Sequence, residues 1–474
     1  MSLFSIGLSG LSAAQNALST TSNNISNVYT DGYSRQLTLL GQNSSGEGGG
    51  SGVSVDGIQR QYNSYISSQL NQVNTRESAL ETYQSQVNQI DDLLADSDSG
   101  LTTLMQNFFS SLEDLTGAPS DAAAREGVLG SARSMVAQFR AYDGYLSDMR
   151  EGINGQIGDV VTQVNDLSDQ IADLNKQVTL ARARSGEEPN ALLDQRDKLV
   201  SDLGELVDVN VQVQDGSTYQ VSLSNGTPLV AGKMSFDLVA VKNSEDPSSI
   251  TIAYEDGAGS RSPLKESVIQ GGELGGLLSF RSETLDSVQN QLGQLAVTLA
   301  VEFNDQHEAG VDINGDSGKA FFEIGGPTII ASANNAGSGS MTAEYGDISE
   351  LTADDYRLTY QADGSLEVEN LSSGKTSTVS QDADGNLSFG GVTLAPGTPP
   401  PAEGDVFTLQ PTRNAAAGFD VALGVLGIGG AASARDRRQL LWWAAAEQYR
   451  GWALPHAPWA AAGRVSARSG TQGW

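Results

Sequence analysis

Few side chains in this sequence are of a type that carries out catalysis or binds transition metals. The chain has no cysteine and two histidines, His307 and His456, so the usual zinc sites and thiol catalysis are ruled out. A hydrolase triad would have to use His307, and no Gly-x-Ser-x-Gly elbow accompanies it. We interpret His307 as a hydrogen-bonded residue at the end of a predicted helix. The sequence therefore predicts no catalytic site and no cofactor.

One short stretch resembles the end of a phosphate-binding loop. It is Gly374-Lys375-Thr376. Such a loop needs another glycine five residues earlier, where this chain has Glu369. The flanking residues have the pattern of strands, so a hairpin turn is the better interpretation.

A second stretch resembles a calcium loop. Asp312, Asn314 and Asp316 occupy positions 1, 3 and 5 of a segment whose twelfth residue is Glu323. The glycine expected at position 6 is replaced by Ser317. We therefore favour a glycine-rich polar turn over a metal site.

Net charge limits the partners of the chain. With 58 acidic and 27 basic residues the formal net charge is −31, so phosphate backbones and anionic lipid surfaces repel it. We expect neither a nucleic-acid partner nor membrane insertion, since no run of about 18 apolar residues occurs. The first charged residue is Asp31 and the first cation is Arg35, so a Sec-type leader with a basic start is not expected.

A helix with an unusual pattern is predicted over residues 3–28. Large apolar residues recur every seven positions with other residues between them, in alternating steps of three and four. The large residues are Phe4, Leu11, Leu18 and Ile25, and those between them are Gly7, Ala14, Thr21 and Val28. A solvated helix usually carries charged pairs, so this uncharged one is predicted to pack on several sides. The alternative is an ordinary N-terminal helix that packs on its own domain.

Further helical regions follow, and one of them has a long apolar seam. Residues 58–116 are predicted to be helical with a break near 96–100, and helices are expected over 128–184, 191–207 and 274–306. Apolar residues alternate in steps of three and four over three heptads: Ile157, Val160, Val164, Leu167, Ile171, Leu174 and Val178. This spacing predicts a coiled-coil-like hairpin or bundle.

Two segments have the period of two that is typical of strands. Val209, Val211 and Val213 alternate with polar residues, and strand signals continue to about residue 270. Residues 320–412 return to this pattern. The predicted fold class is therefore α+β, with a discontinuous scaffold of long coiled-coil-like helices and inserted antiparallel β lobes.

The predicted organisation has six segments. They are an N-terminal core helix and connector (1–57), a helical rod domain (58–207), a β domain (208–270), a return helix of the rod domain (271–319), a second β domain (320–420) and an atypical tail (421–474). Within the first segment, the Gly/Ser-rich stretch 41–52 is interpreted as a flexible connector.

Several strings resemble those of a known family. LSGLSAAQNALSTTSNNISNVYTDGYSRQ (8–36) is similar to the N-terminal signature of flagellar rod, hook and hook-associated proteins. Similarity to the hook-associated protein 1 family is more specific and lies in NALLDQRDKLVSDLGELVDVNV (190–211), GGELGGLLSFRSETLD (271–286), LAVEFNDQHEAGVDINGDSG (299–318) and DVFTLQPTRNAAAGF (405–419). These strings are spread over residues 1–420, and we identify the chain as similar to this family of the flagellar axial superfamily.

The resemblance implies a structural protein and not an enzyme. Members of the family self-assemble as a ring at the hook tip, between the hook protein and the next hook-associated protein toward the filament. Export by the flagellar type III apparatus, an export chaperone and an extracellular location on the flagellum are also implied. In the tubular core, an N-terminal helix pairs with a C-terminal helix.

The resemblance also implies an assembly interface near the N-terminus. The core-forming apolar stripe of the family corresponds by position to Phe4, Leu8, Leu11, Leu18, Ile25 and Val28. The turn that follows the stripe corresponds to Asn23, Asn24, Asn27, Gly32 and Tyr33.

Two other functions stay open at this point. An extracellular enzyme or adhesin would display a catalytic or lectin-type site on the β lobes, and the residues above provide none. Another axial protein, such as the hook or distal rod subunit, would share the N-terminal signature. Only the strings within 190–211 and 271–318 separate the hook-associated proteins from these.

The end of the chain differs in composition from the rest. All five tryptophans lie in the last 33 residues, and residues 425–474 hold six arginines, one aspartate and one glutamate, a net charge of +4. Pro455 and Pro458 would break a helix there, and the expected C-terminal partner of residues 3–28 is not recognisable. We interpret residues 421–474 as the product of a frameshift or sequencing error. The alternative is a divergent interaction segment.

Overall fold

The computed structural model describes residues 3–42, 52–94, 100–214, 218–312 and 315–423. Contacts divide the chain into two units. Unit 1 comprises residues 1–106, 133–300 and 323–420, and unit 2 comprises residues 107–132, 301–322 and 421–474. The atypical tail, from residue 424 on, lies outside the described residues. Within the described part, no helix combines the length and apolar character needed to cross a membrane.

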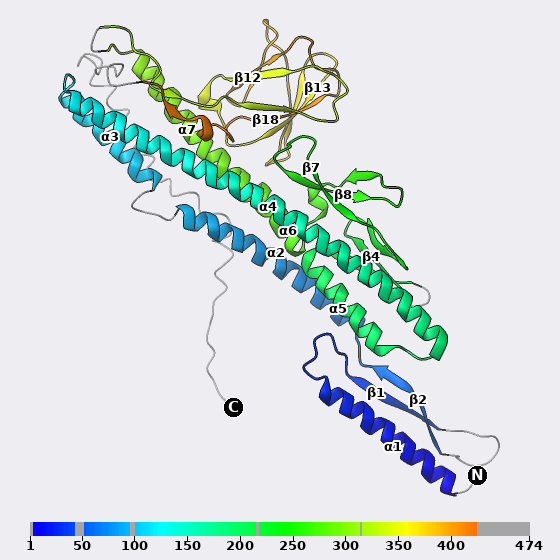
Figure 1. The fold of residues 1–474 in the computed structure, drawn as a ribbon. Coiled ribbons are helices and arrows are strands. Elements are labelled where there is room, and N and C mark those ends of the chain that lie inside the picture. The colour runs from blue at the N-terminus through cyan, green and yellow to red at the C-terminus, as the bar shows by residue number, and fades with distance from the viewer. Residues whose placement is uncertain (1–2, 43–51, 95–99, 215–217, 313–314, 424–474) are drawn as a thin grey trace. The chain divides into compact units, whose positions relative to one another are not determined.

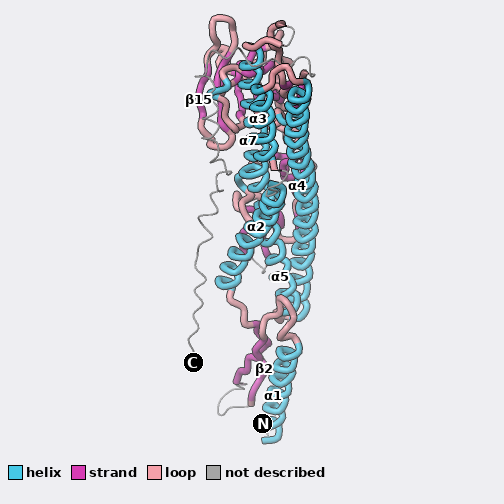
Figure 2. The backbone as a smooth tube through the Cα atoms, turned by 90° about the vertical axis from the view of Figure 1, so that its left-hand side faces the viewer, coloured by secondary structure: helices cyan, strands magenta, loops and turns pink. Residues whose placement is uncertain are grey.

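Long helices form much of the molecule (Figure 1). The α-helices are α1 (Leu3–Ser26), α2 (Ser64–Leu94), α3 (Leu101–Gly117), α4 (Ala122–Ser185), α5 (Asn190–Leu206), α6 (Gly272–Ser279) and α7 (Asp286–Glu308). In unit 1, α2, α5 and the neighbouring part of α4 lie side by side, as two perpendicular views show (Figures 1 and 2). Buried apolar residues of these helices and of α6 form one continuous cluster.

The apolar seam predicted for the longest helix is buried in α4. Six of its seven residues are buried: Ile157, Val160, Val164, Ile171, Leu174 and Val178. Leu167 is only partly buried, while Ser168 beside it is buried and donates a hydrogen bond of 2.8 Å to the Val164 carbonyl. A straight helix drifts by about 20° per heptad from a strict seven-residue repeat. This drift accounts for the burial of Ser168 in place of Leu167.

The helix predicted over 274–306 is present but is not uniformly α-helical. Between α6 and α7 the chain forms a π-helical segment, η3 (Phe280–Leu285). Arg281 in this segment is buried, and its guanidinium donates to the Ile250 carbonyl at 2.7 Å and pairs with Glu266 at 2.6 Å. A π-turn redirects side chains locally, and here it aims an arginine at the neighbouring β module.

The first β module consists of two antiparallel sheets between α5 and α6. One sheet has the order β3-β4-β5-β6, and the other has the order β7-β8-β9. Their bounds are β3 (Val209–Val213), β4 (Tyr219–Leu223), β5 (Pro228–Ala231), β6 (Met234–Ser235), β7 (Leu238–Lys242), β8 (Ile250–Glu255) and β9 (Arg261–Pro263), followed by the 3-10 helix η2 (Glu266–Val268).

The second β module, residues 323–420, also contains two antiparallel sheets, with the orders β11-β18-β13-β14-β15 and β12-β17-β16. Their strands are β11 (Thr328–Ala331), β12 (Met341–Tyr345), β13 (Tyr356–Tyr360), β14 (Leu366–Asn370), β15 (Thr376–Val379), β16 (Leu387–Phe389), β17 (Val392–Pro396) and β18 (Val406–Gln410). The shorter elements are β10 (Phe322–Glu323), η4 (Ile348–Glu350), η5 (Ala416–Gly418) and β19 (Asp420–Val421). Gly374 and Lys375 form the turn between β14 and β15, as interpreted from the sequence.

A hairpin near the N-terminus was not predicted. Strands β1 (Gln36–Gln42) and β2 (Val53–Arg60) pair in antiparallel register, and the loop between them, 43–51, lies outside the described residues. The prediction of helix from residue 58 was therefore wrong, because α2 begins at Ser64. Asn63 marks this start: its side-chain oxygen accepts from the backbone N–H of Tyr65 and Ile66, as an N-cap residue does.

The described part of unit 2 is organised around aromatic rings. Phe108, Phe303, Phe321 and Phe322 contact one another with ring centroids 4.7–6.2 Å apart. His307 stacks on Phe303, and its Nδ1 lies 2.5 Å from the Lys319 carbonyl oxygen, so its position is structural. The Asp312 carboxylate accepts from the Asp316 N–H at 2.9 Å, which closes a polar turn. Asn314 lies outside the described residues.

Candidate functional site

Helix α1 exposes its large apolar side chains. The six residues assigned to the assembly stripe are each 58–80% exposed: Phe4, Leu8, Leu11, Leu18, Ile25 and Val28. The first five lie within the span of α1 at spacings that place them on one face, and Val28 lies in the turn that follows. The described structure thus brings these residues together and covers none of them.

The opposite face of α1 packs on the hairpin through small side chains. Ala13 and Thr20 are buried there, and the Thr38 hydroxyl of β1 donates to the Thr20 hydroxyl at 2.8 Å. Ser9 accepts from the Val53 N–H of β2 at 3.2 Å. The helix therefore buries its small and hydroxyl residues and exposes its large apolar ones, the reverse of an ordinary surface helix. Such a contiguous apolar face indicates an interaction surface.

The residues assigned to the turn after the stripe have roles inside the chain, and two of them, Asn23 and Asn24, lie in the last turn of α1 itself. The Asn24 amide donates to the Gln36 carbonyl at 2.8 Å, and its oxygen accepts from the Gln36 N–H at 2.8 Å and from the Tyr33 hydroxyl at 2.9 Å. The Asn27 side chain donates to the Asn23 carbonyl at 3.0 Å. These bonds fix how the chain leaves α1 and enters β1.

Gly32 completes the same turn. Its φ is +76°, and a side chain there would come within 2.9 Å of the Cβ atom of Lys198 on α5. Only glycine fits both the backbone conformation and the close approach. Contact of the turn residues with a neighbouring subunit stays a prediction.

An ion-paired joint links the hairpin to α5, and sequence reasoning missed it. Arg60, the last residue of β2, pairs with Asp194 at 3.0 Å and with Asp197 at 2.5 Å, and all three side chains are largely buried. The Ser34 N–H donates to Asp194 at 3.2 Å, and Lys198 pairs with Asp31 at 2.9 Å. We call these six residues the Arg60 joint. A signal for it was present in the string 190–211, where three charged residues recur at helical spacing on α5.

An aromatic side chain of the first β module and an amide side chain of α4 support the joint. The Arg196 guanidinium lies 3.4 Å from the centre of the Tyr219 ring, and its Nη1 donates to Asn175 of α4 at 2.9 Å. The Tyr219 hydroxyl donates to Asp197 at 2.6 Å. Burial and the Asp197 charge raise the pKa of Tyr219, so the hydroxyl keeps the proton that it donates.

A second exposed apolar stripe lies on the first half of α2. Its members follow the same steps of three, four and seven: Ile66, Leu70, Val73 and Leu80. The opposite side of α2 packs against α6 through small residues. A side chain at Gly276 of α6 would collide with the carbonyl of Ala79, so the two backbones are in close contact. The stripe was visible as spacing in the sequence and was not recognised.

Comparison with known proteins places this chain. The model of the FlgK helical domain, a flagellar hook-associated protein domain, matches residues 87–322, and a D2-like domain of flagellar hook-associated protein 1 matches residues 330–411. Flagellar hook-associated protein 1 of Escherichia coli K12 is 43% identical over 425 residues, which cover 89% of this chain and 77% of that protein. The chain belongs to the flagellar hook-associated protein 1 family.

Further matches agree with this family. The hook-associated protein 1 of Salmonella typhimurium LT2 is also 43% identical, over 427 residues that cover 89% of this chain and 77% of that protein. The solved structure of the flagellar hook junction protein FlgK from Burkholderia pseudomallei has a TM-score of 0.71 and 36% sequence identity, and the match covers 77% of this chain and 66% of that one. The resemblance inferred from the strings and the α+β fold class are thereby confirmed.

The matched ranges also bear on the open alternatives. A model of flagella basal body rod proteins matches residues 4–33, which contain nearly all of α1 and the whole exposed stripe. That segment is thus similar to flagella basal body rod proteins as well. The two hook-associated protein 1 domains account for the central helices and the second β module, and they decide against a hook or rod subunit.

Proposed function

We infer that this chain is a structural subunit of the bacterial flagellum that joins the hook to the filament. Membership of the hook-associated protein 1 family carries this conclusion. The similar protein from Burkholderia pseudomallei is described as a flagellar hook junction protein. A structural role without catalysis accords with the single described histidine, which is packed between Phe303 and Phe321.

The exposed stripe of α1 is the surface proposed to make the subunit contacts. Its side chains are large, apolar and uncovered, and α1 carries no charged residue that would hold it in water. Neighbouring copies in a ring would cover the stripe, with the hook protein and the next hook-associated protein on either side. The exposed stripe on α2 would be covered in the assembled state as well.

Export is part of the same proposal. The chain is proposed to leave the cell through the flagellar type III apparatus and to be held by an export chaperone beforehand. The absence of cysteine in the whole sequence is compatible with passage as an unfolded chain and with an oxidising exterior.

Deletion of the gene tests the function. The deletion strain should form hooks without filaments and should release flagellin into the medium. Restoration by the wild-type gene provides the control. Loss of the hook itself would contradict a role at the junction and would favour a hook or rod subunit.

A matched pair of substitutions tests the surface. Leu11→Asp places a charge within the stripe, and Ser12→Asp places the same charge one position along the helix, where Ser12 is also exposed. Leu11→Asp should abolish filament formation, because a buried, unpaired carboxylate is costly at an assembled interface. Ser12→Asp should retain filaments. Both proteins must be detected in the medium, and equal loss of function in both would contradict the assigned face.

A further inference from the structure

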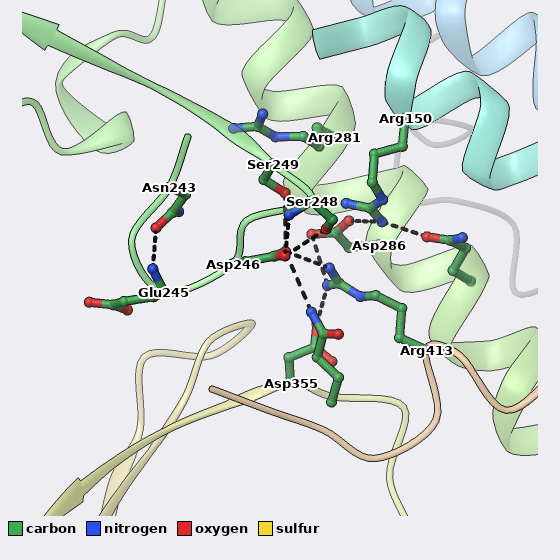
Figure 3. A network of polar contacts seen from close by, with 12 residues as sticks. Arg150, Asn243, Glu245, Asp246, Ser248, Ser249, Arg281, Asp286, Asp355 and Arg413 are labelled. Atoms are coloured by element: carbon green, nitrogen blue, oxygen red, sulfur yellow. Dashed lines mark hydrogen bonds and ion pairs between the residues drawn. The ribbon is translucent and has the colours of Figure 1, made fainter. Parts of the chain in front are cut away.

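A buried network of ions joins the second β module to the rest of unit 1 (Figure 3). Arg413, which follows β18, pairs with Asp286 of α7 at 3.0 Å, with Asp246 of the loop between β7 and β8 at 3.4 Å, and with Asp355 of its own module. The Arg413 side chain is 7% exposed and that of Asp355 is 6% exposed. One guanidinium thus bridges three separate parts of the fold.

A second arginine completes this set. Arg150 of α4 pairs with Asp286 at 2.6 Å and donates to Gln289 of α7 at 2.5 Å. The network therefore contains two guanidinium groups and three carboxylates. We call Arg150, Asp246, Asp286, Asp355 and Arg413 the Arg413 network.

The remaining contacts around the network are also largely polar. Gln294 of α7 donates to the Leu351 carbonyl at 2.6 Å, and Arg357 pairs with Glu245 at 2.7 Å. A contact between two buried rings, Phe139 and Phe419 with centroids 5.2 Å apart, adds apolar burial at the C-terminal end of the module. Among the described residues, the apolar cluster that unites the helices with the first β module includes no residue of 323–420. Directional polar contacts thus form a substantial part of the attachment.

Buried ion pairs contribute little net stability but are intolerant of misplacement. Removing one partner leaves an uncompensated charge, whereas a correctly placed set fixes one geometry. Polar interfaces between modules also permit relative motion when their specific contacts are lost.

We propose that the Arg413 network is a conformational lock, which holds residues 323–420 in a single orientation against α7 and the 243–249 loop. Without Arg413, the second β module reorients while it and the helical body both stay folded. This inference does not depend on the flagellar function, because the lock operates within one isolated chain.

Distance measurements between spin labels test the proposal. The chain has no cysteine, so labels attach only where cysteines are introduced. Ser147→Cys on α4 and Ser377→Cys on β15 are both exposed and report the orientation of the module. Thr342→Cys with Ser377→Cys, both on the module, reports its internal fold.

The expected result is specific to the network. Arg413→Gln should broaden or shift the 147–377 distance distribution and leave the 342–377 distribution unchanged. Arg261→Gln is the matched control, since Arg261 pairs with Glu255 at 2.7 Å within one hairpin, and it should alter neither distribution. An unchanged 147–377 distribution in Arg413→Gln would overturn the proposal, and so would a change of the 342–377 distribution.

A second variant covers failure of Arg413→Gln to fold. Asp246→Asn removes the ion pair between the loop and Arg413. The asparagine oxygen can still accept the hydrogen bond that the Ser248 N–H donates to Asp246 at 3.1 Å. Broadening of the 147–377 distribution in this variant supports the lock. A wild-type distribution overturns it.

Discussion

The two β modules are built alike and attached differently. Both consist of two antiparallel sheets, and the first lies between α5 and α6 whereas the second follows α7. In the first module, buried residues such as Val221, Leu229 and Ile252 belong to the same apolar cluster as α4 and α5. The second module has its own buried core, which includes Leu358 and Phe407, and meets α7 through the Arg413 network.

The difference shows two ways to attach a β module to helices: by a shared apolar core, or by ion pairs and hydrogen bonds between separate cores. Apolar burial is non-directional and contributes about 25 cal/mol per Å², so a shared core unites two parts into one cooperative body. Ion pairs and hydrogen bonds contribute less but specify geometry. The first module should therefore unfold with the helices, whereas the second should be able to unfold or move by itself.

A matched truncation in each module gives the strongest test of this comparison. Leu229→Ala and Leu358→Ala each remove a fully buried leucine, and each should cost about 2–5 kcal/mol in the free energy of unfolding of its part. Leu229→Ala should also lower hydrogen-exchange protection in α4 and α5, because its cluster includes both helices. Leu358→Ala should lower protection only within residues 323–420. Equal loss of protection in α5 in both variants would contradict the comparison.

A smaller effect is expected for an amide that ties α4 to the first module. Asn175 is buried, donates to the carbonyls of Tyr219 at 2.9 Å and Gly232 at 2.6 Å, and accepts from the Tyr219 N–H at 3.0 Å. Asn175→Ala leaves these groups unpaired and should cost roughly 1–3 kcal/mol, measured by denaturant unfolding. Gln177→Ala, at an exposed position of the same helix, should stay within about 0.5 kcal/mol of the wild type. A similar loss in the free energy of unfolding for both variants would show that the hydrogen bonds of Asn175 do not stabilise the fold.

The smallest effect concerns the pH dependence of the second module. Burial raises the pKa of Asp355 to about 6, despite the favourable charge of Arg413. The other charged groups that act on Asp355 are Asp286 and Arg150. Burial would also raise the pKa of Asp246, but bonds from Ser248 and the charge of Arg413 outweigh it and lower that pKa. Within the Arg413 network, the pKa of Asp355 is thus raised, whereas that of Asp246 is lowered.

The sign of the expected change follows from linkage. Native Asp355 binds a proton at a higher pH than the unfolded chain does, so its contribution to the free energy of unfolding rises as the pH falls from about 7 to about 5. The free energy of unfolding of the wild type relative to Asp355→Asn should therefore increase over this interval. Glu266, whose pKa burial raises too, titrates in both proteins and cancels in the difference. A difference that is constant with pH would contradict the raised pKa.

Periodic features of the fold could be predicted from the sequence. Heptad spacing indicated α1 and the seam of α4, because a helix repeats its faces every three to four residues. The alternation of Val209, Val211 and Val213 indicated the first strand of the first module. These signals are local, so a single sequence carries them.

Features that join distant residues could not be predicted. Arg413 and Asp286 each lie in a string that resembles the family, but nothing in either string indicates that the two residues pair. Arg60 is similarly remote in the sequence from Asp194. Asn175 reads as a surface residue of a long helix because its partners are the backbone groups of a different module. The hairpin β1–β2 was missed because its strands flank a glycine-rich stretch that has the composition of a linker.

The Arg60 joint has a mechanical consequence. Force applied to the exposed face of α1 reaches α5 through the hairpin and its turn, which meet α5 at Arg60, Ser34 and Asp31. Torque applied to α1 would therefore act mainly on the few ion pairs and hydrogen bonds that join the β1–β2 hairpin to α5. The more exposed pair, Lys198 with Asp31, is screened by salt, while the largely buried Arg60 pairs are screened much less. The stiffness of the coupling between the N-terminal helix and the body should thus be largely insensitive to the ionic strength of the surroundings.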